Sequence, residues 1–116
     1  VLPQTLILLG GPEVSFDGEQ ILRETAADFI LCGEGEEAFS QLCLALEDKA
    51  AVLSRVPSLI YKEGEEIRIN APAEPLDLGK LPFVYDDLEI YENRILYYEA
   101  QRGCPFNCQY CLSSGR

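Results

Sequence analysis

Three cysteines lie close together near the end of this chain, at Cys104, Cys108 and Cys111, in a C-x3-C-x2-C run. An iron–sulfur cluster needs thiolates arranged around one small cube, and spacings this short allow a single loop to supply them. A four-iron cluster held by three thiolates leaves one iron without a protein ligand, and that open position can take a substrate or a cofactor. The run therefore predicts a cluster-binding loop with one open coordination position.

Two other interpretations of these cysteines remain open. A structural zinc site needs four ligands. Because the chain has no histidine, the fourth would have to be Cys32 or Cys43, more than sixty residues upstream. A disulfide with one spare thiol conflicts with a cytoplasmic setting. The alternative function is accordingly a non-catalytic iron–sulfur or zinc-binding module. We otherwise expect Cys32 and Cys43 to be small residues of the core.

The sequence around the cysteines, residues 97–114, resembles the radical S-adenosylmethionine superfamily. The motif of that superfamily is C-x3-C-x-aromatic-C, and Tyr110 fills the aromatic position. The apparent strand that precedes the loop also fits the resemblance. Further matches lie just before and inside the loop, at Arg102, Gly103, Pro105 and Asn107.

This resemblance implies that Cys104, Cys108 and Cys111 each bind one iron of a 4Fe-4S cluster and that the fourth iron binds S-adenosylmethionine. Tyr110 would lie near its adenine. An electron, supplied by a reductant protein such as flavodoxin or ferredoxin, would cleave the cofactor to methionine and a 5′-deoxyadenosyl radical that abstracts hydrogen from a small-molecule substrate. The implied parent protein is an enzyme of cyclisation or methylation whose substrate the sequence does not identify.

The first half of the chain predicts an open α/β sheet. Residues 5–9 and 28–31 are short apolar runs typical of strands buried on both faces, as in a parallel sheet. Asp17 and Gln20 resemble a capping box that opens a helix through residue 25. Residues 36–48 are the clearest helix, because apolar residues recur there at three- and four-residue spacing. That stripe comprises Ala38, Phe39, Leu42, Cys43 and Leu46.

The second half begins with a predicted β-hairpin, residues 58–62 and 65–70 around a turn at Glu63-Gly64. Residues 71–82 hold three prolines, and we interpret this extended segment as a domain boundary. Residues 95–98 then give one more apparent strand that leads into the cysteine loop.

Residues 8–12, followed by residues 28–36, resemble the C-terminal part of a cobalamin-binding domain. Such a domain precedes the radical domain in the branch that includes proteins like the anaerobic magnesium-protoporphyrin monomethyl ester cyclase and several methyltransferases. The resemblance implies a flavodoxin-like parallel sheet with cobalamin, as a further cofactor, at the carboxyl ends of its strands. Gly10 and Gly11 would border the nucleotide tail, and Gly33 would lie in the neighbouring loop. A Gly-Gly-Pro sequence after a strand is also typical of a simple tight turn.

The implied organisation has three parts. Residues 1–50 are the C-terminal part of the cobalamin-binding-type domain, residues 51–90 a hairpin and Pro-rich linker, and residues 91–116 the first strand of a partial (β/α) barrel with its cluster loop. The family's D-x-H-x-x-G motif is absent from these residues, because the chain has no histidine.

The charge balance narrows the classes of partner. Twenty acidic against nine basic residues give a net charge of −11, which disfavours binding to nucleic acid or to a membrane surface. No apolar run approaches the roughly 20 residues of a membrane span, so we expect a cytoplasmic protein. The absence of an initiator methionine suggests a fragment, with further strands upstream. We expect such a fragment to be catalytically inert alone and able to self-associate through open strand edges.

Overall fold

The computed structural model describes residues 4–48, 52–106 and 108–111. The chain divides into two compact units, Val1–Leu76 and Asp77–Arg116, here called the sheet unit and the cysteine unit. The division falls inside the Pro-rich segment 71–82. The domain identities assigned to residues 1–50 and 91–116 stay predictions. Residue Asn107, one of the motif positions, lies outside the described residues.

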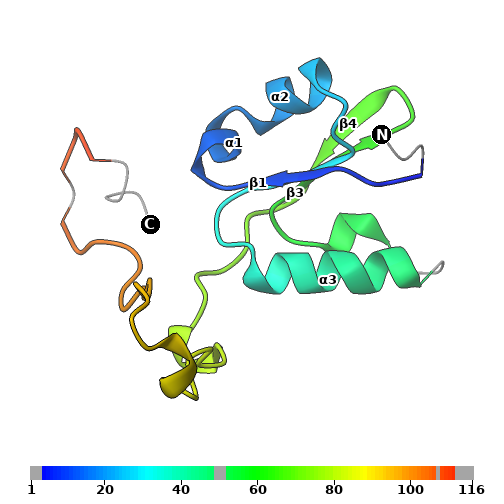
Figure 1. The fold of residues 1–116 in the computed structure, drawn as a ribbon. Coiled ribbons are helices and arrows are strands. Elements are labelled where there is room, and N and C mark those ends of the chain that lie inside the picture. The colour runs from blue at the N-terminus through cyan, green and yellow to red at the C-terminus, as the bar shows by residue number, and fades with distance from the viewer. Residues whose placement is uncertain (1–3, 49–51, 107, 112–116) are drawn as a thin grey trace. The chain divides into compact units, whose positions relative to one another are not determined.

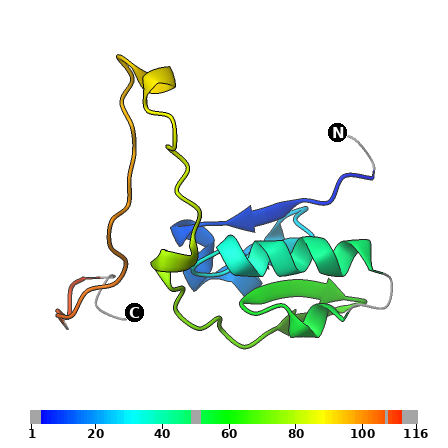
Figure 2. The same ribbon diagram turned by 90° about the horizontal axis from the view of Figure 1, so that it is seen from below.

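The sheet unit has three layers, with α1 and α2 on one face of a sheet and α3 on the other (Figures 1 and 2). None of the helices in the described residues is long and apolar enough to span a membrane. In chain order the elements are β1 (Leu8–Gly10), α1 (Pro12–Phe16), α2 (Gly18–Glu24), β2 (Phe29–Leu31), α3 (Glu36–Glu47), the 3-10 turn η1 (Leu53–Arg55), β3 (Leu59–Glu63) and β4 (Glu66–Ile69).

The four strands lie in the order β1-β2-β3-β4. β1 and β2 are parallel, with Gly10 opposite Leu31, which confirms the predicted parallel pair. β3 runs antiparallel to β2, with Ile30 opposite Ile60, so the sheet is mixed. The predicted hairpin exists, but its assignment to a linker is wrong because its strands continue the same sheet. Its first strand is a core strand, since its residues Leu59, Ile60 and Tyr61 are all buried.

The hairpin turn differs by one residue from the predicted one. Glu63 pairs with Glu66, so the turn residues are Gly64 and Glu65 instead of Glu63 and Gly64. Gly64 has φ +64°, whereas Glu65 is not among the residues of positive φ. A type II′ turn requires a positive φ at its first central position only, and glycine is the residue that adopts it without strain. This requirement sets the register of the hairpin.

Each face of the sheet has its own apolar core. On the α3 side Phe29 and Leu31 pack with Leu42, and on the other side Ile30 packs with Leu22. Alternate residues of β2 therefore point to opposite faces, and all three are buried, as the continuous apolar run predicts. β1, at the sheet edge, is only half-buried to exposed, so the prediction that it is buried on both faces is wrong.

The predicted helix 36–48 is confirmed as α3, but only part of its apolar stripe is in the core. Ala38 and Leu42 are buried, whereas Phe39 is 51% exposed and Leu46 is 44% exposed. Cys43 is exposed as well, so its assignment to the core is wrong. Successive residues turn by about 100° around a helix, and this stripe is therefore wider than the strip that the sheet covers.

The helix predicted from Asp17 is α2, which begins at Gly18 and ends at Glu24. The predicted capping box is wrong: the Asp17 side chain makes no cap hydrogen bond, and the Gln20 amide donates to the Glu24 carboxylate at 2.9 Å instead. Asp17 closes α1 as well as preceding α2, which leaves its backbone outside the extended conformation that a capping residue needs. α1 is an addition to the predicted elements.

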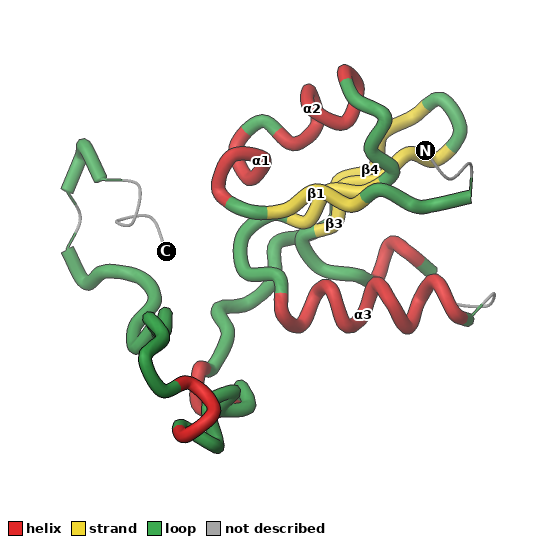
Figure 3. The backbone as a smooth tube through the Cα atoms, in the orientation of Figure 1, coloured by secondary structure: helices red, strands yellow, loops and turns green. Residues whose placement is uncertain are grey.

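The cysteine unit contains two 3-10 turns, η2 (Leu78–Lys80) and η3 (Glu89–Tyr91), and its described residues contain no strand (Figure 3). The strand predicted at residues 95–98 is therefore not formed. Ile95 is 84% exposed and Tyr97 is 83% exposed. A strand is stable only when a neighbouring strand completes its hydrogen bonds, and the described residues pair no strand with this segment.

Substitution of Gly18 by alanine is expected to destabilise the sheet unit. Gly18 is buried, and an added Cβ would lie 2.7 Å from Ile60 Cδ1 and 3.3 Å from Ile30 Cγ2. We expect Gly18→Ala to lower the free energy of unfolding by about 1–3 kcal/mol through overpacking, measured by urea denaturation. Gly35→Ala is the control, because a Cβ there meets nothing within 4 Å. Equal stability of the two variants would contradict the close packing of α2 on the sheet.

Candidate functional site

The cysteine loop lies wholly in the cysteine unit. Cys104 and Cys108 are half-buried and Cys111 is exposed, and none of the chain's cysteines is in a disulfide. The backbone N–H of Cys111 donates to the carbonyl of Cys108 at 3.1 Å, which makes a tight turn between these two residues. Gly103, just before the first cysteine, has φ +74°, a conformation that favours glycine. The loop thus turns at both of its ends.

The three thiols are not gathered into a metal site. Within residues 4–48, 52–106 and 108–111, no group of three or more Cys, Asp or Glu side chains lies close enough to hold a metal ion. The donor set itself suits an iron–sulfur cluster, because three soft thiolate ligands come from one short loop and no disulfide occupies them. The Tyr110 side chain is 92% exposed. The roles of Cys104, Cys108, Cys111 and Tyr110 stay predictions.

The carboxyl ends of the parallel strands meet at one edge of the sheet. Since Gly10 pairs with Leu31, the loops that follow β1 and β2 start side by side. The Ser15 hydroxyl joins them: it donates to the carbonyl of Gly11 at 2.8 Å and accepts from the N–H of Gly33 at 3.0 Å. The structure therefore brings the predicted residues Gly10, Gly11 and Gly33 together at this edge.

Backbone conformation explains two of these glycines. Gly11 has φ +100° and Gly33 has φ +73°, and a Cβ at either position would meet nothing within 4 Å. Both residues thus need glycine for the turn and also leave open space beside the backbone. A Cβ on Gly10 would lie 3.7 Å from the carbonyl oxygen of Leu31, an ordinary contact. The edge is open enough for a ligand to approach, and the role of these glycines in binding one stays a prediction.

Two further residues organise this edge without having been singled out from the sequence. Ser15 stands one turn after Gly11, and this short spacing is the signal that could have identified its bond to the Gly11 carbonyl. Glu34, in the loop after β2, accepts a hydrogen bond from the backbone N–H of Leu76 at 2.8 Å. That contact spans 42 residues, and no local pattern predicts it.

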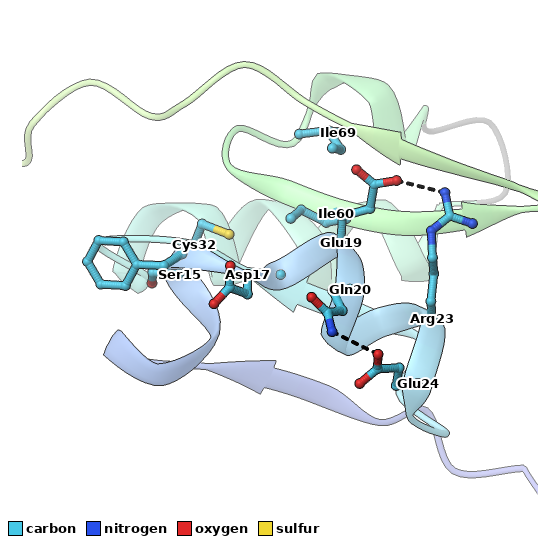
Figure 4. A pocket seen from close by; sticks show the side chains of 11 residues that line it. Ser15, Asp17, Glu19, Gln20, Arg23, Glu24, Cys32, Ile60 and Ile69 are labelled. Carbon is cyan, nitrogen blue, oxygen red and sulfur yellow. Dashed lines mark hydrogen bonds and ion pairs between the residues drawn. The ribbon is translucent and has the colours of Figure 1, made fainter.

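An open hollow of about 550 Å³ is lined by residues of α1, α2, β3 and β4 (Figure 4). Glu19 pairs with Arg23 at 2.7 Å, and Gln20 donates to Glu24, so most of the polar rim is satisfied internally. Neither the carboxyl-edge glycines nor the cysteine loop is among its lining residues. These are Ser15, Phe16, Asp17, Gly18, Glu19, Gln20, Arg23, Glu24, Cys32, Ile60 and Ile69.

Cys32 is a structural residue at the end of this hollow. It is half-buried against the core of the α1–α2 face, in partial agreement with the predicted core position. Its Sγ lies 3.9 Å from the carbonyl oxygen of Val14. Burial raises the pKa of the Cys32 thiol above its ordinary value, which keeps it protonated and poorly reactive at neutral pH.

Known proteins match the chain over almost its whole length, although no protein-family model matches it. An uncharacterized methyltransferase of Pyrococcus horikoshii is 36% identical and covers 93% of the chain. The anaerobic magnesium-protoporphyrin IX monomethyl ester cyclase of Synechocystis sp. is 31% identical and covers 98% of it. The cobalamin-dependent radical SAM methyltransferase TokK of Streptomyces tokunonensis is 26% identical and covers 94% of it.

The chain spans a quarter or less of the length of these relatives. It covers 25% of the Pyrococcus protein, 24% of the cyclase and 18% of TokK. The activities in their names belong to proteins several times longer than this chain of 116 residues.

Substitution of Ser15 by alanine is expected to loosen the carboxyl edge. The Gly33 N–H would lose its acceptor, so we expect its hydrogen exchange to become faster and the free energy of unfolding to fall by about 0.5–1.5 kcal/mol. Amide exchange followed by NMR measures the first effect. The control is Ser40→Ala on the exposed side of α3. Unchanged exchange at Gly33 in the Ser15 variant would contradict the bridge between the two loops.

Proposed function

The chain is related to radical S-adenosylmethionine enzymes, as its cysteine run predicted, and we propose that it is part of such an enzyme and supplies the cluster ligands. The observation that carries this proposal is the set of three cysteines in a C-x3-C-x2-C run on one loop. A relative named as a cobalamin-dependent radical SAM methyltransferase, aligned with 94% of the chain, supports it.

In this proposal Cys104, Cys108 and Cys111 bind three irons of a 4Fe-4S cluster through their Sγ atoms, as thiolates. When bound, the cluster and S-adenosylmethionine supply the one-electron chemistry that breaks an otherwise stable carbon–sulfur bond. Three protein ligands leave the position at which the cofactor would bind. Tyr110, which is 92% exposed, is accessible for contact with the adenine ring.

Binding of the cluster must reorganise the loop. The thiols are not grouped in the described residues, so the free energy of metal binding has to order the segment between the first and the last cysteine. The turn between Cys108 and Cys111 already holds two of the ligands on one short piece of backbone. Ordering therefore concerns mainly the approach of Cys104 to this pair.

We propose that the sheet unit is the C-terminal part of a flavodoxin-like sheet that continues beyond β1. Residues 4–12 contain no charged side chain, although β1 is an edge strand. At the opposite edge, β4 carries Arg68, which pairs with Glu63 and Glu66. Charged edges resist pairing with further strands, whereas uncharged apolar edges favour it. Further parallel strands at β1 would complete the domain, and without them the same edge favours self-association.

We propose cobalamin as the ligand of the carboxyl edge, bordered by Gly10, Gly11 and Gly33. Open space beside Gly11 and Gly33 supports this assignment, as does one relative, which is named a cobalamin-dependent radical SAM methyltransferase. The longer protein would methylate or cyclise a small molecule, would receive electrons from a reductant protein such as flavodoxin or ferredoxin, and would work in the cytoplasm, where thiols stay reduced.

Anaerobic reconstitution with iron and sulfide tests the proposed ligands. We expect about four irons per chain and a reduced electron paramagnetic resonance signal that shifts when S-adenosylmethionine is added. Cys104→Ala should abolish this signal because it removes one of three ligands, whereas Cys43→Ala, an exposed cysteine of α3, should retain it. Tight stoichiometric zinc in place of the cluster would favour the non-catalytic metal-binding module.

A further inference from the structure

Four aromatic rings organise the cysteine unit. The ring of Tyr85 contacts that of Phe83 at 5.9 Å and that of Tyr91 at 5.3 Å between centroids, and Phe83 contacts Tyr98 at 5.9 Å. All three contacts are edge-to-face, the favourable geometry for aromatic pairs. Tyr85 and Phe83 thus connect the start of the unit, the turn η3 and the segment that leads to the cysteines.

Tyr85 also makes a polar contact with that last segment. Its hydroxyl donates a hydrogen bond to the backbone carbonyl of Tyr97 at 2.7 Å, and its side chain is half-buried. The bond crosses 12 residues and fixes main chain instead of a side chain. The Tyr97 side chain itself is 83% exposed, so the position of its backbone depends on such contacts.

The segment between Tyr97 and the first cysteine is short and held at several points. Arg102 Nε donates to the Glu99 carboxylate at 2.8 Å, which closes one turn of chain. Gly103 then has φ +74°, and Cys104 follows directly. Cys104 is the seventh residue after Tyr97. A displacement of the Tyr97 carbonyl would therefore move the first thiol relative to the other two.

We propose that Tyr85 is a positioning residue for the cysteine loop, acting through its hydroxyl on the Tyr97 carbonyl. The inference rests on the proposed function of the loop. Because the thiols are not grouped in the described residues, metal binding has to gather them, and the chain loses conformational freedom at that step. When the segment before Cys104 is already held in place, less conformational freedom of the loop remains to be lost on binding. Loss of this hydrogen bond therefore weakens metal binding without removing a ligand.

Tyr85→Phe tests the proposal, because it removes the hydroxyl and keeps the ring contacts. Tyr91→Phe is the matched control: it removes a hydroxyl from the same ring cluster that has no hydrogen-bond partner among the described residues. In the metal-free chain, we expect the backbone carbonyl ¹³C resonance of Tyr97 to move upfield in Tyr85→Phe, because this carbonyl loses a hydrogen bond, and to keep its parental position in Tyr91→Phe.

Metal affinity is measured in the same variants with Co²⁺ alone, whose thiolate absorption bands report coordination by cysteine. We expect the dissociation constant to rise about three- to tenfold in Tyr85→Phe and not in Tyr91→Phe. A parental Tyr97 carbonyl resonance in Tyr85→Phe, equal Co²⁺ affinity in the two variants, or no Co²⁺ binding by the parental chain would each overturn the proposal. Failure of iron and sulfide to form a four-iron cluster would refute the proposed function, whereas the carbonyl resonance and the Co²⁺ affinities would still decide the role of Tyr85.

Discussion

The burial of β2 places almost everything else in the sheet unit. This strand pairs in parallel with β1 and antiparallel with β3, so its backbone is hydrogen-bonded on both sides. Its side chains enter both cores, with Phe29 8%, Ile30 0% and Leu31 4% exposed. Because both helical layers pack on these three residues, the strand determines where each layer lies on its face of the sheet. It also fixes the edge at which the two glycine loops begin.

Local sequence patterns predicted the elements of this unit better than their partners. The apolar runs identified β1 and β2, and the helical spacing identified α3, because the period of side-chain burial is a property of each segment alone. The helix α2 was predicted from a capping box that is not formed. The same patterns placed the hairpin in a linker, since the sequence of residues 58–70 does not determine which strand pairs with β3. The width of the strip that covers α3 is likewise a tertiary property, so Phe39 and Cys43 were assigned to a core that does not reach them.

For the candidate site, the sequence predicted the kinds of residue better than their arrangement in space. Residue type and spacing sufficed to predict three ligands, because the number of cysteines and the length of loop between them follow directly from the sequence. Their arrangement is not, since a loop takes its final shape from the metal and from neighbouring segments. The sequence also identified Gly11 and Gly33 but missed Ser15, whose hydroxyl joins their loops. The spacing from Gly11 could have indicated the bond of Ser15 to that carbonyl, but no local pattern indicates its bond to Gly33, 18 residues away.

The hydrogen bond between Glu34 and Leu76 limits how the loop after β2 can vary. Surface loops usually tolerate insertions and deletions well. Here the loop from Cys32 to Gly35 also anchors the main chain where it leaves the sheet unit. An inserted residue would shift the Glu34 carboxylate away from the Leu76 N–H, and the hydrogen bond of the Ala73 N–H to the Ser58 hydroxyl would then be the last one to hold the departing chain. The length of this loop is therefore expected to be constant among proteins that share the arrangement, even where its sequence changes.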